Sequence, residues 1–355
     1  MDIQKAGNNS TQVQASVINV YNGITEARAR EIYQEEFEKI KELTKEAKQT
    51  AFQRVGELEN RVIPKLSKID KGLELFSNPD FQFLLLEAQK SAARSERSAD
   101  YDLLTELLIH RVKNNSNREK MLAIKKAVEI VDSISDEALL GLTVLHSVSS
   151  FTPTAGNMES GLDSLDELFG KIIYDELPQG EHWLDHLDIL GTIRINAISR
   201  LKPICDFYSE RLEGYVCTGI SKKSEDYQKA LQIIADIKSS DNILVDHILN
   251  PGFVRINIPD RYSLNSSSKE ITTTISLSEH EKSLLKDVFS LYDKDTNIIK
   301  NIKQRFSEEW DKRPNLLLLK NWWGNIPNGV AITEVGKVLA HANAQRCDNS
   351  LPSMD

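Results

Sequence analysis

The feature that most constrains this chain is an uninterrupted helical pattern between residues 25 and 63. Apolar side chains recur there every three or four residues, and the first proline is Pro64. This spacing places the apolar side chains on one face of an α-helix. A helix of about 38 residues would be about 57 Å long, at 1.5 Å per residue. One small domain cannot cover that length, so we predict a coiled-coil or inter-subunit element.

A strand-like leader precedes this helix at residues 1–24. Val13, Ala15 and Val17 alternate with polar residues, which is typical of a half-buried strand. A lone strand leaves its backbone groups without partners, so a second copy of the chain is the simplest partner. The alternative is that the helix folds back onto residues 79–151 of the same chain. Self-association through residues 1–63 is the prediction, and the side chains expected to carry it are Val13, Val17, Ile32, Ile40, Leu43, Val55 and Leu58.

Local patterns divide the whole chain into five segments and predict a mainly α fold. A capping box at Ser278 and Glu281 opens one helix of the last segment, and Asn117 closes a loop between two earlier helices. The segments are the strand-like leader at 1–24, the long helix and oligomerisation segment at 25–78, a four-helix bundle at 79–151, an α-rich central domain with an acidic segment at 152–268, and a small C-terminal winged-helix-like module at 269–355.

The end of the chain resembles the end of a winged-helix domain. Trp322, Trp323 and Gly324 are followed by an extended stretch, and then by a helix start in which Thr333 and Gly336 are spaced as Thr-x-x-Gly. Residues 276–346 hold 11 Lys or Arg and 9 Asp or Glu, so no strongly basic surface is expected. Protein contacts are therefore favoured for this module over DNA contacts. We expect only weak binding to random duplex DNA at physiological salt.

Composition excludes several classes of protein. The net charge of -9 creates no general attraction to nucleic acid or to anionic lipid. The three cysteines are widely spaced and include no Cys-x-x-Cys pair, which suits a reducing cytoplasm. The first ten residues are too polar for a signal peptide, and no apolar run approaches the roughly 18 residues of a membrane span. We expect a cytoplasmic protein that neither spans a membrane nor depends on nucleic acid.

The acidic segment offers the one candidate metal site. Residues 155–192 contain nine acidic residues and a single basic one, Lys171. His182 and His186 lie four residues apart, so they would share one helix face, with Asp185 beside them. The pair lacks the glutamate and third ligand of a zinc-protease motif. Surface or capping histidines are the competing interpretation, and otherwise no cofactor is expected.

The familiar catalytic motifs are missing from the sequence. It contains no Gly-x-x-x-x-Gly-Lys-Ser/Thr loop, no Gly-x-Ser-x-Gly elbow and no Gly-x-Gly-x-x-Gly fingerprint. Cys217 stands in the apolar sequence Tyr-Val-Cys-Thr-Gly. Such a cysteine is more often structural than nucleophilic.

Several segments at both ends and in the middle of the chain together resemble one family. They are GNNSTQVQA (7–15), ARAREIY (27–33), LEAQ (86–89), LLIHRV (107–112), ITEVGK (332–337) and AHAN (340–343). They are similar to the LPO-type family of uncharacterised bacterial proteins, and the middle segments also resemble helical proteins of phage abortive infection. The resemblance implies a bacterial or mobile-element origin and a defence role. It supplies no active site to transfer.

Three functional hypotheses follow from these observations. The first is a non-enzymatic, oligomeric helical protein that acts through protein contacts in bacterial phage defence. The second is an effector enzyme with an unfamiliar, metal-dependent site at His182, His186 and the neighbouring carboxylates. The third is a DNA-binding regulator that uses the C-terminal module.

Overall fold

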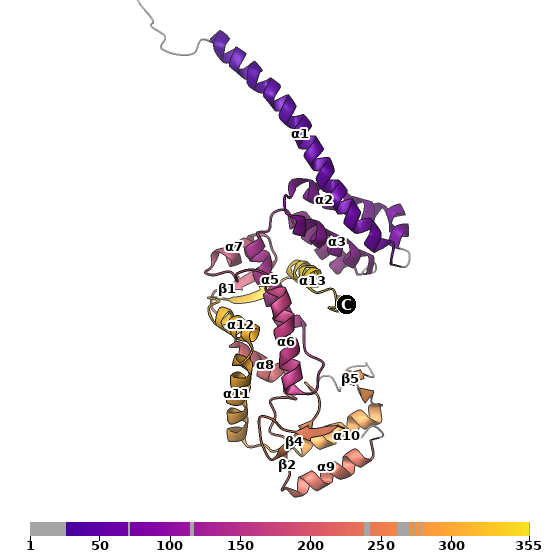
Figure 1. Cartoon of the computed structure of the whole chain (residues 1–355), viewed down its shortest axis with the longest axis vertical. Helices are drawn as coiled ribbons and strands as arrows, with labels where there is room; N and C mark the ends of the chain where they lie inside the picture. Colours follow the sequence, from indigo (N-terminus) through magenta and orange to yellow (C-terminus); the bar gives the residue numbers. More distant parts are fainter. Residues whose placement is uncertain are drawn as a thin grey trace, which may run out of the picture. The chain divides into compact units, whose positions relative to one another are not determined.

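Figure 1 shows the computed structural model of the chain, which is mainly helical as predicted. The structure describes residues 26–69, 72–113, 117–237, 242–260, 270–272, 275–276 and 278–354. The predicted strand-like leader, with Val13 and Val17, lies outside the described residues. The chain divides into two compact units, residues 1–53 and 54–355. None of the described helices combines the length and the apolar character that crossing a bilayer requires.

The predicted long helix is confirmed as α1, Glu26–Leu66, which has 41 residues. It continues through Pro64 to Leu66, and because proline has no N–H, the carbonyl of Asn60 lacks its usual backbone donor there. Residues 44–50 are exposed. Leu58, Val62 and Leu66, four residues apart, are instead fully buried in the core of the second unit. The last turns of α1 therefore pack into the unit of residues 54–355, which we call the body. The alternative that α1 packs within its own chain was stated for the whole helix, and it describes these last turns.

Four helices follow with the boundaries that their capping residues specify. The side chains of Asn78, Asn117 and Ser135 each accept a hydrogen bond from a backbone N–H in the first turn of the helix that follows. The short 3-10 helix η1, Gly72–Ser77, leads into this group. The four helices are α2 (Pro79–Arg94), α3 (Ser98–Lys113), α4 (Arg118–Ile130) and α5 (Asp136–Ser150).

The last helix of the chain completes this bundle. Helix α13, Glu334–Cys347, packs against α3, α4 and α5. Thr333 caps it as the Thr-x-x-Gly pattern predicts, because its Oγ1 accepts from the N–H of Gly336. Gly336 is required at this point, since a Cβ there would lie 2.0 Å from the carbonyl oxygen of Thr192.

The chain between α5 and α13 contributes to two hydrophobic cores. Its first part, α6 (Met158–Ile172), α7 (His182–Ile189) and α8 (Ile204–Arg211), shares a core with α11 (Thr296–Asp311) and α12 (Pro314–Gly324). Helix α12 packs on α6, and α11 packs on α8 (Figure 1). Strand β1, Ile193–Asn196, pairs antiparallel with β7, Gly329–Ile332.

A second, smaller hydrophobic core lies around a three-stranded antiparallel sheet of order β2-β4-β3. The strands are β2 (Ile220–Ser221), β3 (Leu244–Asp246) and β4 (Phe253–Ile256). Helices α9 (Glu225–Ala235) and α10 (Glu279–Ser290) complete it, and the predicted capping box at Ser278 is present. Two short strands, β5 (Glu270–Thr272) and β6 (Ile275–Ser276), pair with each other.

The predicted boundary before residue 269 does not separate two cores. Helix α10 belongs to the smaller core with β4, through Leu285 and Val288. Helices α11, α12 and α13 belong to the larger core with the bundle. The wing-like strand β7 likewise pairs with β1, which precedes the boundary. Residues 269–355 are therefore distributed over two cores, because their apolar faces are complementary to earlier parts of the chain.

The role of the last turns of α1 can be tested with two leucines. We predict that Leu58→Ala lowers the free energy of unfolding by about 2–5 kcal/mol, because Leu58 is 1% exposed. The matched control is Leu122→Ala on α4, where the leucine is 59% exposed and a change within about 0.5 kcal/mol is expected. Urea unfolding of both variants supplies the comparison. Equal effects would show that Leu58 is not part of the body.

Candidate functional site

The predicted metal residues lie on α7, where His182 and Asp185 are exposed and His186 is half-buried. The Nε2 atom of His186 accepts a hydrogen bond of 3.2 Å from the N–H of Ser135 at the start of α5. This contact gives His186 a capping role. Within the part of the chain that the structure describes, no group of three or more His, Cys, Asp or Glu side chains is arranged to hold a metal ion. The metal site has no geometric support beyond the spacing on α7.

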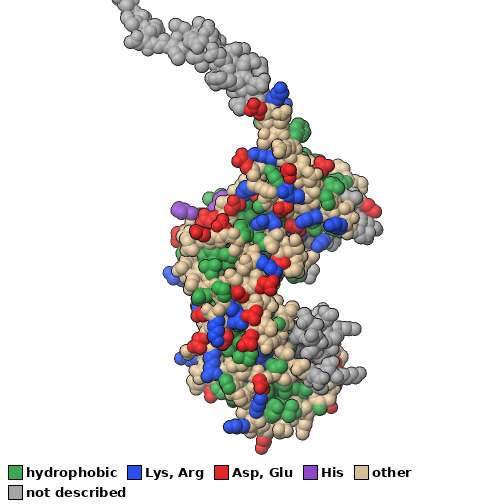
Figure 2. Space-filling model, viewed as in Figure 1, with side chains coloured by type: hydrophobic (Ala, Val, Ile, Leu, Met, Phe, Trp, Pro, Cys, Tyr) green, Lys and Arg blue, Asp and Glu red, His purple; other side chains and the backbone are tan. Residues whose placement is uncertain are grey.

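Several carboxylates of the acidic segment are paired with more distant residues. Asp163 accepts from Arg313 at 2.7 Å. Asp166 caps the start of α12, because its Oδ1 accepts from the N–H groups of Asn315 and Leu316. Figure 2 shows acidic and basic side chains interspersed over the visible face. Part of the local charge of this segment therefore serves the packing of α6 against α12.

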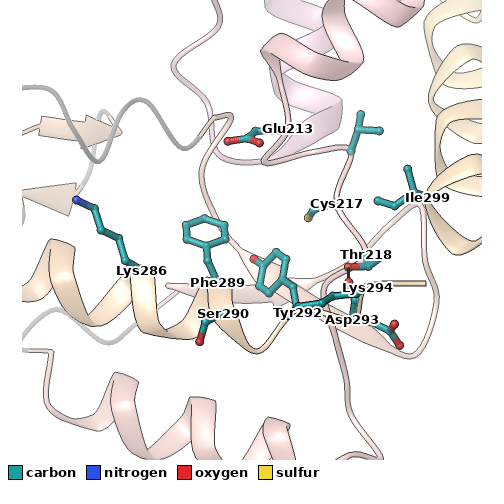
Figure 3. Close-up of a pocket in the computed structure, with 11 residues that line it drawn as sticks. Glu213, Cys217, Thr218, Lys286, Phe289, Ser290, Tyr292, Asp293, Lys294 and Ile299 are labelled. Carbon is teal, nitrogen blue, oxygen red and sulfur yellow. Dashed lines mark hydrogen bonds between the residues drawn. The ribbon is translucent and has the colours of Figure 1, made fainter. Parts of the chain in front are cut away.

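Cys217 is one of the residues that line a pocket of about 550 Å³. Figure 3 shows its side chain among those of the other lining residues. The lining comes from the loop after α8, the end of α10, and the connection from α10 to α11. Thr218 ties two of these segments together, because its hydroxyl donates to the carbonyl of Asp293. The N–H of Asp293 donates in turn to the carbonyl of Gly219 at 3.0 Å. The pocket wall is therefore built from two loops that hold each other.

The geometry around Cys217 does not activate its thiol. The thiol lies 3.4 Å from the carbonyl oxygen of Gly214, to which it donates. The Nε2 atom of His247 is 3.9 Å from the sulfur but only 2.6 Å from the Cys217 carbonyl oxygen. A carbonyl can only accept, so Nε2 carries a proton and cannot take one from the thiol. Burial lowers the pKa of His247 to about 4, so the ring is neutral at pH 7. These contacts favour a structural role for Cys217.

A buried arginine, Arg255, holds the loop after α8, which also contributes to the wall of this pocket. Arg255 of β4 donates to four carbonyl oxygens, those of Gly156, Gly214, Ile256 and Ile258, at 2.7 to 3.3 Å. Its guanidinium also lies 5.4 Å from the centre of the Tyr215 ring. Five fixed donors suit this arrangement of backbone acceptors, and burial lowers the pKa of the guanidinium. Arg255 therefore joins β4 to the loop after α8 and to the segment before α6.

Three histidines form a cluster in the interior: His110 on α3, His146 on α5 and His341 on α13. The rings of His110 and His146 lie 5.6 Å and 5.5 Å from the ring of His341, centre to centre. All three side chains are buried. The cluster exists because α13 lies against both α3 and α5.

Hydrogen bonds give this cluster a defined direction. His341 Nε2 lies 2.9 Å from the carbonyl oxygen of Pro352, so this nitrogen must donate. In a neutral ring Nδ1 of His341 is then an acceptor, and His146 Nε2 donates to it at 3.3 Å. The remaining nitrogen of His146, Nδ1, accepts from the hydroxyl of Ser150 at 3.2 Å. The chain of donors therefore runs from Ser150 through His146 and His341 to Pro352.

Burial keeps the histidines of this chain neutral. It lowers the pKa of His146 to about 3 and that of His341 to about 4. Burial also lowers the pKa of His110, whose Nε2 lies 2.6 Å from the amide oxygen of Gln345. A neutral ring has one nitrogen that donates and one that accepts, so the directions above hold at pH 7.

The end of the chain of donors at Ser150 lines a pocket. Ser150 and His146 line a cavity of about 300 Å³ whose other walls are mostly apolar. An apolar cavity with a few convergent polar groups is the usual form of a small-molecule site. Ser149 also lines the cavity, and the apolar and basic residues that complete the lining are Leu145, Val148, Leu201, Phe207, Trp323, Val330, Ile332, Lys202 and Lys337.

Sequence reasoning missed this cluster. His110 is separated from His146 by 36 positions and from His341 by 231, so no spacing motif joins them. Two of them do occur in the segments LLIHRV and AHAN that carry the family resemblance. Their juxtaposition depends on the packing of α13 into the bundle, which no local pattern indicates.

A second apolar groove, of about 280 Å³, lies between the last turns of α1 and helix α2. Val55 and Ile63 of α1 line it together with Phe76 and Leu85. Val55, which the sequence assigned to self-association, is half-buried at this groove. Leu58 lies at its base and is fully buried within the body. Ile32, Ile40 and Leu43, which the sequence also assigned to self-association, lie earlier in α1.

A model of one uncharacterised protein family matches residues 23–353, which is most of the chain. The chain therefore belongs to that family. No curated protein and no solved structure shows significant similarity to it. The LPO-type assignment and the link to phage defence stay predictions.

The buried histidines predict a loss of stability in mild acid. The unfolded chain binds protons at histidine below a pH of about 6.5, whereas His146 in the folded chain does not until its pKa of about 3. Stability is therefore fully present above pH 6.5 and falls as the pH decreases towards 3. Between pH 7 and pH 5 the loss due to His146 alone should be about 2 kcal/mol.

Urea unfolding at pH 7 and pH 5 measures this loss. His146→Asn removes the titrating group, so the variant should lose about 2 kcal/mol less than the parent chain over that interval. An identical pH dependence in the two proteins would show that His146 is not buried in the neutral form.

Proposed function

We propose that this member of an uncharacterised family is an assembly protein, which self-associates through α1 and acts through protein contacts in bacterial phage defence. The defence role rests on the resemblance of its end and middle segments to LPO-type and abortive-infection proteins. The self-association rests on the length and the surface of α1. A cytoplasmic location agrees with both.

The observation that carries the proposal is the contrast within α1. Its last turns bury Leu58, Val62 and Leu66 in the body. Earlier in the same helix residues 44–50 are exposed and polar apart from Ala47, whereas Phe52, a large apolar side chain, is 77% exposed. A helix of this length gains most of its stability from packing, so an uncovered stretch favours a partner. A second copy of α1 is the partner that supplies the same apolar spacing.

The energetics are sufficient for association. Each aliphatic side chain that is fully buried against a second helix contributes roughly 1.5–3 kcal/mol. The apolar stripe predicted in α1 includes Ile32, Ile40 and Leu43, and Val55 extends it to the apolar groove beside α2. Several such side chains can offset the entropy lost on association.

The alternatives have less support. A DNA-binding regulator would need a strongly basic surface on the C-terminal module, but residues 276–346 hold 11 Lys or Arg against 9 Asp or Glu. A metal-dependent enzyme would need further ligands close to His182 and His186, which the described residues do not provide. Protein contacts through α1 are therefore the function favoured here.

Light scattering on the full chain tests self-association. We expect an oligomer whose mass is a multiple of that of the chain, and a double variant, Ile32→Glu with Ile40→Glu, that is monomeric, because two charges in an apolar seam cannot be desolvated. The matched control is Leu122→Glu with Ile198→Glu, which adds the same two charges at exposed aliphatic positions and should leave the mass unchanged. A monomeric parent chain, or an oligomeric double variant, would contradict the proposal.

A further inference from the structure

Ser150 is exposed and stands at the last position of α5, and it begins the chain of donors from Ser150 through His146 and His341 to Pro352, called here the histidine relay. Its hydroxyl donates to Nδ1 of His146 at 3.2 Å. His146 is held in turn by His341, and His341 by the carbonyl of Pro352. A nucleophile, a base and a group that orients the base are the three parts of an activated serine.

We propose that Ser150 is a nucleophile for acyl transfer, with His146 as its general base and His341 as the positioning residue. The substrate class is a carboxylic ester with an apolar acyl group. The cavity of about 300 Å³ beside Ser150 fits such a group, because Leu145, Phe207 and Trp323 are among its walls. The indole N–H of Trp323 is already used by the carbonyl of Lys202 at 2.9 Å, so its ring contributes an apolar surface.

The reaction balances with water as the second reactant. The Ser150 oxygen bonds to the ester carbonyl carbon while its proton moves to His146 Nδ1. The bond from that carbon to the alcohol oxygen then breaks, and His146 returns the proton to the departing alkoxide. Water attacks the acyl-serine in the same way: one of its protons passes to His146 and then to the Ser150 oxygen, which releases the carboxylic acid.

A fixed positive charge stands close to the reacting serine. Arg211 of α8 donates to the carbonyl of Ser149 at 2.6 Å and to the hydroxyl of Thr152 at 3.0 Å. These two residues flank Ser150 at a distance of one and two positions. The guanidinium therefore fixes the local backbone, and its charge favours the negatively charged transition state of acyl transfer.

This inference does not depend on self-association through α1. The residues involved lie on α5, α8 and α13, all in the unit of residues 54–355. It also gives a site to the hypothesis of an effector enzyme with unfamiliar chemistry, but with serine in place of a metal. Labelling of Ser150 and the mass of the assembly are separate measurements, so either proposal can fail alone.

A fluorophosphonate probe on the full chain tests the nucleophile. The Ser150 oxygen displaces fluoride from phosphorus, and its proton passes to His146, so the adduct appears by mass spectrometry in the peptide that contains residue 150. We expect Ser150→Ala to abolish the adduct and His146→Ala to slow its formation by about 100-fold or more. Ser290→Ala is the matched control and should label at the rate of the parent chain, because Ser290 is an exposed serine at the last position of α10, lies outside the lining of this cavity, and donates its hydroxyl to the carbonyl of Asp287.

His341 needs a measurement that distinguishes positioning from structure. His341→Ala should slow labelling, whereas His341→Asn should restore part of the rate, because its amide oxygen can accept from His146 Nε2. Thermal unfolding of each variant reports whether the fold is kept. Since Ser150 is exposed, Ser150→Ala should fold normally, so its labelling decides whether Ser150 is the nucleophile. Absence of an adduct in the parent chain, an adduct on another residue, or equal labelling of Ser150→Ala and the parent would overturn the proposal.

Discussion

The packing of α13 against α3, α4 and α5 is the contact on which the larger core depends. Small side chains make it possible, since Ala340, Ala342 and Ala344 are fully buried and allow the helices to approach closely. Polar side chains make it specific. His341 meets His146, and Asn343 donates to the hydroxyl of Thr143 at 2.8 Å. A buried polar group without a partner is costly, so these pairs select one rotation of α13 in the bundle.

The same principle operates at the smaller core. There the buried charge of Arg255 is satisfied by four carbonyls from three segments, without a carboxylate among those partners. Gly214 is needed beside it, because a Cβ would lie 2.1 Å from the carbonyl oxygen of Ile258. Later parts of the chain thus pack against earlier parts in two places. Strand β4 and helix α10 pack with the loop after α8, and α13 packs into the bundle. Both contacts bring together groups that are distant in sequence.

Much of the local structure could be predicted because it depends on local chemistry. Asn117, Ser278 and Thr333 begin their helices through side-chain hydrogen bonds that a sequence displays directly. The β1–β7 pair and the division of residues 269–355 between two cores could not be predicted, because they depend on which apolar faces meet. The candidate site follows the same rule. His182 and His186 were visible as a spacing, whereas Ser150, His146 and His341 become a relay only once α13 is in place.

Helix α13 has two roles, as a helix of the bundle that packs against α3, α4 and α5, and as the source of His341 for the proposed relay. Both require that α13 opens only when the bundle opens. Amide hydrogen exchange on the full chain measures this directly, since it reports the free energy of opening for each helix. We predict that residues 338–345 exchange as slowly as the buried amides of α3 and α5, with the same dependence on denaturant. Faster exchange of α13, through an opening that leaves α3 and α5 protected, would show that it is a separate module and would remove the basis of the relay.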